Sequence, residues 1–242
     1  MITSVNNEQI VELAKLHQKK YRDRLKLALV DGEHLIQEAY KASVLTQVYG
    51  LNEDALLSDI PYTQVSESVM RKLCITTSLS RFIGVIQIKE PLPLEDFVLV
   101  LDGVQDPGNV GTLLRSALAF DFKSIICLPG CADPYGPKAI AASQGALFQC
   151  SINPMSLEEF TTQVSLKSYD VIVSDVHHAA SLQNLQFKTP CMLVLGSEGA
   201  GVSESVKALA TQRVRIDTNH VESLNVAMAG SILMHSLFVL KG

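Results

Sequence analysis

The sequence predicts an α/β protein built from two units of unequal size, and three observations support this. Short, nearly continuous apolar runs alternate with helical patterns from residue 97 onward, which is typical of parallel strands buried on both faces. Residues 1–90 hold a second, smaller set of helical and strand patterns. Between them, two prolines among charged residues predict a linker at 91–96. We therefore expect one domain at 1–90 and another at 97–242.

The front domain is expected to be a small mixed unit of helices and strands. Apolar residues recur at helical spacing in its first segment and form short runs further along. The elements that we expect are helices at 6–16, 32–40, 51–57 and 66–73, and strands at 27–30 and 81–88.

The second domain repeats a strand–helix order, which predicts a layered parallel sheet. In such folds ligands bind at the carboxyl ends of the strands. The strands that we expect are 97–101, 125–128, 171–173, 192–195 and 214–216, and the helices are 111–120, 137–148, 156–165, 203–209 and 224–240.

The composition excludes several classes of protein. The chain has 242 residues, of which 47% are hydrophobic and 19% charged, so it is not a disordered chain. Its net charge of −5 excludes a globally basic protein that coats nucleic acid, but not a local basic patch. Five cysteines without a CxxC pair disfavour a disulfide framework or a structural zinc site. We expect no bound metal and no membrane span, and a cytoplasmic location because no secretory signal pattern opens the chain.

One stretch of the front domain is strongly basic. Residues 15–26 hold six basic residues against one acidic residue, a local charge of +5, whereas 1–90 as a whole holds 11 of each sign. The plain explanation is a solvated helix face, and the functional one is contact with RNA phosphates. The residues that we expect to bind RNA are Lys15, Lys19, Lys20, Arg22 and Arg24.

Three predicted strands of the second domain end in unusual polar segments. Residues 102–111 read DGVQDPGNVG and open a helix, and a helix opened by bare backbone suits an anion or an RNA backbone. Residues 196–201 read GSEGAG, a tight loop with one carboxylate. Residues 216–226 read IDTNHVESLNV and lead into the most apolar helix. Taken singly, each segment also fits an ordinary turn or a helix cap.

A nicotinamide-dependent dehydrogenase would also use glycine-rich turns after strands. Such an enzyme needs GxGxxG and an acidic residue about 20 positions later, and neither is in place. A phosphate-binding P-loop is excluded as well, because no Gly-Lys-Ser/Thr occurs.

Taken together, the three segments resemble the signature motifs of the SpoU (TrmH-like) family of S-adenosylmethionine-dependent RNA ribose 2′-O-methyltransferases, within the SPOUT superfamily. The resemblance covers about residues 97–240. Residues 7–38 resemble the family's ribosomal-protein-like substrate-binding domain. The resemblance implies a parallel-sheet domain with a deep trefoil knot, S-adenosylmethionine as the methyl donor, and a homodimer that shares its active site across the interface.

The resemblance also implies roles for individual residues. The catalytic set that it implies is Asn109, Arg115, Glu198, Ser223 and Asn225, and the donor-binding set is Leu195, Gly196, Gly201, Ile216 and Leu224. Arg115 is better placed as a phosphate clamp and oxyanion stabiliser than as a base, because a guanidinium has a pKa above about 12.

This chain departs from the family pattern at two positions. Many members have proline where this chain has Asp217, and many have arginine where it has Ala141. The second change removes one expected RNA phosphate contact and none of the catalytic residues.

The substrate is expected to be a structured RNA. The two-domain layout favours ribosomal RNA over transfer RNA, again by similarity to the family. A transfer-RNA methyltransferase and a non-catalytic RNA-binding module are the alternatives. Because all five polar motif residues are kept, we expect an active enzyme.

Overall fold

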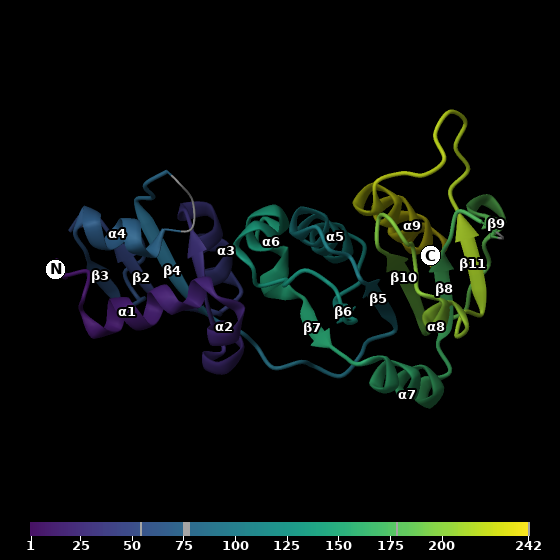
Figure 1. Ribbon diagram of the computed structural model, residues 1–242, viewed down its shortest axis with the longest axis horizontal. Coiled ribbons are helices and arrows are strands. Elements are labelled where there is room, and N and C mark those ends of the chain that lie inside the picture. The colour runs from purple at the N-terminus through teal and green to yellow at the C-terminus, as the bar shows by residue number, and fades with distance from the viewer. Residues whose placement is uncertain (54, 75–77, 178, 242) are drawn as a thin grey trace.

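The computed structural model describes residues 1–242 apart from 54, 75–77, 178 and 242. Two α/β units lie side by side, each built around its own sheet, and an extended segment along one flank connects them (Figure 1). The expected α/β class is confirmed. The knot implied by the resemblance stays a prediction.

The first unit is a four-stranded mixed sheet with strand order β1-β4-β2-β3. β4 lies between β1 and β2 and is antiparallel to both, whereas β3 is parallel to β2. The elements are α1 (Glu8–Ala14), α2 (Lys19–Leu25), β1 (Leu27–Asp31), α3 (Glu33–Lys41), β2 (Leu45–Gly50), β3 (Tyr62–Gln64), α4 (Glu67–Leu73) and β4 (Phe82–Gln87).

The helix expected at 51–57 is wrong. The residues on either side of position 54 form bends and turns between β2 and β3. Backbone carbonyls there are used by side chains of β3: Gln64 donates to the carbonyl of Leu51, and the Tyr62 hydroxyl donates to that of Asn52. These carbonyls therefore serve the link to β3 rather than a helical hydrogen-bond ladder.

The second unit is a seven-stranded sheet with order β7-β6-β5-β10-β8-β11-β9, and every pairing is parallel. The five expected strands are present, and the short edge strands β7 and β9 are added to them. The strands are β5 (Phe97–Asp102), β6 (Ser124–Cys127), β7 (Ser151–Pro154), β8 (Asp170–Ser174), β9 (Ala180–Ser181), β10 (Cys191–Gly196) and β11 (Gln212–Arg215).

Helices cover both faces of this sheet, which explains why the inner strands are continuously apolar. Side chains of β5 alternate between two cores: Leu99 packs with α5 and α9, and Val100 packs with α7 and α8. Figure 1 shows α5, α6 and α9 along one side of the sheet and α7 on the other. The helices are α5 (Pro107–Ala119), α6 (Pro137–Ser143), α7 (Leu157–Lys167), α8 (Glu204–Lys207) and α9 (Val226–Leu240).

No described helix combines the length and the apolar character needed to cross a bilayer. The most apolar one, α9, has 15 residues.

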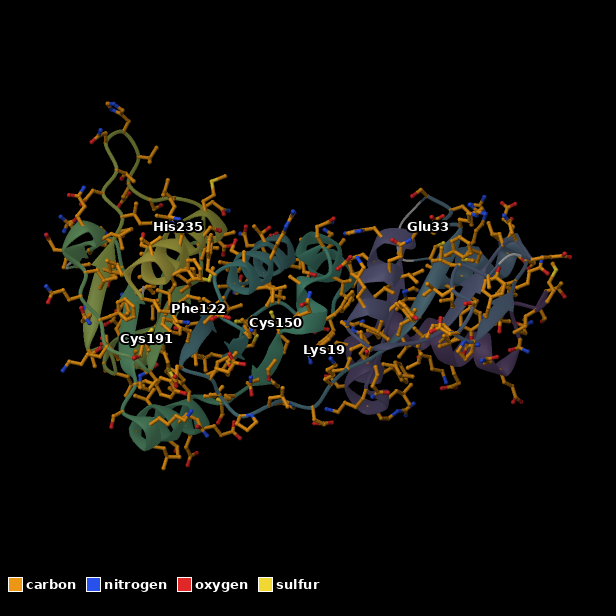
Figure 2. All side chains as sticks on the ribbon, turned by 180° about the vertical axis from the view of Figure 1, so that it is seen from behind. Lys19, Glu33, Phe122, Cys150, Cys191 and His235 are labelled. Atoms are coloured by element: carbon orange, nitrogen blue, oxygen red, sulfur yellow. The ribbon has the colours of Figure 1, made fainter. Side chains whose placement is uncertain are left out.

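A buried ion pair joins the two units. Arg22 of α2 is only 5% exposed and donates through Nε and Nη2 to Asp133, which follows β6, at 3.2 and 2.5 Å. Its Nη1 donates to the carbonyl of Leu16. Lys19, on the same helix, is marked near the junction in Figure 2. The expectation that Arg22 binds RNA is corrected by this placement, because its guanidinium is enclosed and its donors are engaged within the protein.

We expect Arg22→Met to lower the free energy of unfolding by about 3 kcal/mol, because it leaves the Asp133 carboxylate without its partner in a largely buried place. The control is Lys20→Met on the same helix, an exposed position where a change within about 0.5 kcal/mol is expected. Urea unfolding of both variants measures the difference. Equal, small effects would contradict a structural role for Arg22.

Candidate active site

The three polar segments meet at the carboxyl edge of the large sheet. The second and third segments line a cleft of about 540 Å³, a size typical of small-molecule sites. The first segment adjoins it through Asn109, which hydrogen-bonds to Glu198 and Asn225 in the cleft wall. The walls of the cleft come from the ends of β8, β10 and β11, from the loop 196–202 and from the start of α9. In Figure 1 the loop between β11 and α9 projects from the body of the protein beside this edge.

Close backbone packing fixes the glycine-rich loop after β10. Ser197 and Gly201 exchange backbone hydrogen bonds of 3.0 and 2.9 Å across the loop. A Cβ atom on Gly196 would lie 2.0 Å from the backbone carbon of Gly201, so a larger residue cannot stand there. The Asp102 carboxylate at the end of β5 accepts from the backbone N–H of Ser203 at 2.7 Å. The loop is therefore held from both sides before any ligand binds.

A hydrogen-bonded chain of three side chains connects the three segments. The Asn109 amide donates through Nδ2 to Glu198 and accepts through Oδ1 from Asn225, the latter at 3.1 Å. Asn225 in turn caps α9, because its Oδ1 accepts from the backbone N–H of Ala227 and Met228. Three of the predicted catalytic residues, far apart in sequence, thus lie together.

All five predicted donor-binding residues line the cleft. Leu195, Ile216 and Leu224 supply apolar surface, and the glycines expose backbone. Ser223, Glu198 and Asn225 also line it. Ser223 is exposed and forms no hydrogen bond with the described part of the chain, so its hydroxyl is available to a ligand.

Arg115 is the predicted catalytic residue that neither lines the cleft nor hydrogen-bonds to a described residue that does, whereas Asn109 hydrogen-bonds to the lining residues Glu198 and Asn225. It lies on α5 six residues beyond Asn109, about 9 Å further along the helix axis. Its side chain is exposed and has no hydrogen bond or ion pair with any described residue. The cleft walls come from other elements.

Among the described residues, the charged cleft-lining residues that were not predicted are Asp175, Lys207, Arg215 and Glu222. Asp175 follows β8 and is nearly buried, with Lys207 of α8 at 3.6 Å and Arg213 of β11 at 3.9 Å. Hydrogen bonding to Glu204, with the nearby Asp175 charge adding to it, raises the pKa of Lys207. The position of Asp175 directly after a buried strand was the available sequence signal.

Two further features of the motifs have structural explanations. A Cβ atom on Gly111 would lie 2.4 Å from the carbonyl oxygen of Ala139, so this glycine lets α5 approach α6 and does not face a ligand. Asp217, where the family often has proline, accepts from Ser181 and from Arg215 Nε. Both hydrogen bonds lower the pKa of Asp217, and the one from Ser181 contributes most. The bond from Ser181 also ties the end of β11 to β9.

Among the described residues, no three His, Cys, Asp or Glu side chains come together in a way that could hold a metal ion. Cys127 ends β6 and Cys131 follows it four positions later, and burial raises the pKa of both thiols.

The fold and this cleft define a class of protein. Residues 96–235 match the SpoU rRNA methylase family, and residues 7–79 match the MRM3-like substrate binding domain. The chain therefore belongs to the SpoU rRNA methylase family, and the expected family is confirmed.

Individual relatives match along the whole chain. The 23S rRNA (guanosine(2553)-2′-O)-methyltransferase RlmP of Bacillus subtilis is 28% identical over 98% of both chains. A putative RNA methyltransferase of the TrmH family from Porphyromonas gingivalis has a solved structure with a TM-score of 0.85 and 32% identity, over 96% of this chain and 98% of that one. The SpoU methyltransferase AviRb of Streptomyces viridochromogenes, solved with the cofactor AdoMet, has a TM-score of 0.87 at 21% identity, over 98% of both chains, which shows the shared fold.

We expect Asn225→Asp to keep the helix cap of α9 and to remove the hydrogen bond that residue 225 donates to Asn109. The carboxylate can still accept from the N–H groups of α9, so folding should be kept, but it cannot donate to Asn109 and it adds a charge close to Glu198. Methyl transfer should fall on the order of 100-fold, the scale of a lost catalytic hydrogen bond. Thermal unfolding and single-turnover transfer give the two readouts. Wild-type turnover in this variant would exclude the Asn109–Asn225 contact from catalysis.

Proposed function

We propose that this protein transfers a methyl group from S-adenosylmethionine to a ribose 2′-hydroxyl of ribosomal RNA. The observation that carries the proposal is the Asn109–Glu198–Asn225 chain, which draws all three motif segments to one cleft. The full-length match to a relative named as a 23S rRNA 2′-O-methyltransferase supports the reaction and the substrate class.

The cleft suits S-adenosylmethionine chemically. This donor combines an apolar adenine, a ribose and a cationic sulfonium, whose methyl group it gives to a nucleophile. Apolar side chains such as Leu195 and Ile216 would pack against the adenine, and the bare backbone of the glycine loop allows close approach. The walls hold three carboxylates, Asp175, Glu198 and Glu222, against two cations, Lys207 and Arg215, and this excess of negative charge favours a cation.

The polar chain would orient the reacting groups rather than supply a base. Glu198 accepts a hydrogen bond from Nδ2 of Asn109, and Asn225 donates one to Oδ1, so both ends of the Asn109 amide are held. Holding the ribose 2′-hydroxyl close to the methyl group of the donor would account for much of the rate acceleration, because the two reacting groups then need no separate encounter in solution. The free Ser223 hydroxyl at the cleft would accept a hydrogen bond from the attacking 2′-hydroxyl. The proton of that hydroxyl would pass to a nearby RNA phosphate or to water as the methyl group moves from sulfur to oxygen and the thioether product is left.

We further propose a homodimer in which Arg115 completes the site of the partner. One side of α9 exposes Met228, Ile232, His235 and Val239, which recur at helical spacing and include two apolar side chains more than half exposed. Figure 2 marks His235 on this helix. The exposed Arg115 lies on α5, which packs directly beside α9 and is linked to it by the Ser116–Ser231 hydrogen bond. An apolar stripe of this kind marks a protein interface.

The front domain would bind RNA through the remaining basic residues. Three cations surround the ring of Tyr21: Lys20 at 4.9 Å, Arg24 at 5.1 Å and Lys15 at 5.8 Å from its centroid. Lys19 pairs with Asp23 at 2.6 Å and stays exposed. Clustered cations around an aromatic ring fit an RNA backbone with an unpaired base.

Transfer to unmodified 23S rRNA tests the proposed function. We expect tritium from methyl-labelled S-adenosylmethionine to enter 23S rRNA. Alkaline hydrolysis should leave a single linkage uncleaved, the one on the 3′ side of the 2′-O-methylated nucleotide. Calorimetric titration should show binding of S-adenosylmethionine and none of NAD. Labelling of transfer RNA alone would assign the transfer-RNA alternative, and donor-independent RNA binding without transfer would assign a binding module.

Mixing two inactive variants tests the shared site. Arg115→Ala should lose on the order of 100-fold or more in turnover, and so should Arg115→Lys, which keeps the charge but not the bidentate fork. If Arg115 serves the partner's cleft, a mixture of Arg115→Ala with Glu198→Ala chains regains about a quarter of wild-type activity, because half of the randomly exchanged dimers contain one intact site. Equal activity before and after exchange would place Arg115 in its own chain's site or outside the mechanism.

A further inference from the structure

A second cleft lies between the two units, apart from the candidate active site. It measures about 520 Å³. One wall comes from α2 and the start of the linker, and the other from the loops that follow β6 and β7. Leu128, Pro129 and Met155 give it a largely apolar floor, and Tyr135 lies among them. Because both units contribute, the cleft exists only when they are packed together.

The Tyr135 hydroxyl is an unused polar group at this floor. It has no hydrogen-bond partner among the described residues. Those residues also include no fully enclosed side-chain polar atom that lacks a partner, so the hydroxyl must reach solvent. A tyrosine hydroxyl is neutral at pH 7 and able to donate, and burial of the ring raises the pKa of Tyr135 further. An aromatic face with a free hydroxyl can both stack on a ligand and hydrogen-bond to it.

The rim of the cleft is basic. Lys19, Lys26 and Lys89 line it together with Asp23 and Asp133. Lys19 pairs with Asp23 and Arg22 pairs with Asp133, so the positive charge of the rim comes from Lys26 and Lys89. Lys26 lies 3.6 Å from Glu90, and Lys89 donates one hydrogen bond of 3.0 Å to a backbone carbonyl. An ammonium carries three donors, so both lysines keep donors for an anion.

The position of the cleft links it to the candidate active site. β6 and β7 end at the same carboxyl edge of the sheet as β10, and β6 is two strands from β10, about 10 Å away. The strand-end loops touch in series: a Cβ atom on Gly103 would lie 4.0 Å from Ser197, and one on Gly130 would lie 3.5 Å from Gly103. One continuous edge therefore connects the two clefts.

We propose that the interdomain cleft binds an unpaired nucleotide of the substrate RNA, close in sequence to the methylated ribose. The base packs on Pro129, Tyr135 and Met155, and the adjoining phosphate is held by Lys26 and Lys89. Proteins read RNA mainly at unpaired, splayed bases that stack on aromatic side chains, which is the chemistry this cleft offers. The inference rests on the proposed function, since it needs RNA as the substrate.

Two variants and a matched control test this site. Tyr135→Phe removes the hydroxyl and keeps the ring, and the double variant Lys26→Gln/Lys89→Gln removes rim charges from exposed side chains. The control is Lys188→Gln, an exposed lysine at the opposite edge of the sheet, just before β10. Each protein is assayed for methyl transfer to 23S rRNA and for S-adenosylmethionine affinity.

We expect Tyr135→Phe to raise the KM for RNA about threefold to tenfold, the effect of one lost hydrogen bond, with kcat and donor affinity unchanged. The lysine double variant should lower the slope of log affinity against log salt by roughly 1 to 2. Photocrosslinking of wild-type protein to 4-thiouridine-substituted 23S rRNA should label the peptide that spans 129–135.

The outcomes separate the two proposals. Suppose that the wild-type protein methylates rRNA, but the cleft variants change neither the KM for RNA nor the salt slope, and no crosslink falls in 129–135. This inference is then overturned and the proposed function stands. If no RNA receives a methyl group, the proposed function fails and the inference fails with it. The inference would also be overturned if Lys188→Gln raised the KM as much as the cleft variants do. The effect would then come from the overall charge of the protein and not from the cleft.

Discussion

The amide of Asn109 is the contact on which the candidate active site depends. It donates to one neighbouring segment and accepts from the other, since Glu198 offers oxygen and Asn225 offers N–H. A carboxylate at 109 would repel Glu198, and an apolar residue would take a donor from Glu198 and an acceptor from the Asn225 Nδ2 group. The same contact also joins two helix beginnings, because Asn109 lies in the first turn of α5 and Asn225 caps α9.

The inner strands were predictable because they are buried on both faces and so read as continuous apolar runs, as β5 and β10 do. The missed strands lack that signal: β7 and β9 are short edge strands, and β3 is three residues long with no buried residue. β2 was missed as well, because the polar Thr46 and Gln47 interrupt its apolar run. The wrong helix at 51–57 has apolar residues at helical spacing. Its carbonyls, however, bond to a strand that follows it, which is a tertiary contact that no local pattern contains.

Within the site, the sequence predicted residue types better than residue roles. The motif order brought Asn109, Glu198 and Asn225 together as expected, since parallel strands end at one edge. Counting charges placed Arg22 among RNA ligands, but its partner lies 111 positions away in the other unit. A basic stretch shows how many cations a helix carries, not which of them the fold encloses.

Helix α9 couples the candidate active site to the surface proposed for dimerisation. Its first turn is held by Asn225, which lines the cleft, and its inner face packs against β10, where a Cβ atom on Gly230 would lie 2.5 Å from Leu195. Its outer face carries the exposed apolar stripe. A helix that is tightly packed inside cannot shift without moving Asn225 and Leu195, so a partner pressed on the stripe would fix the cleft as well. In the proposed dimer, covering the stripe and fixing the cleft would then be one event.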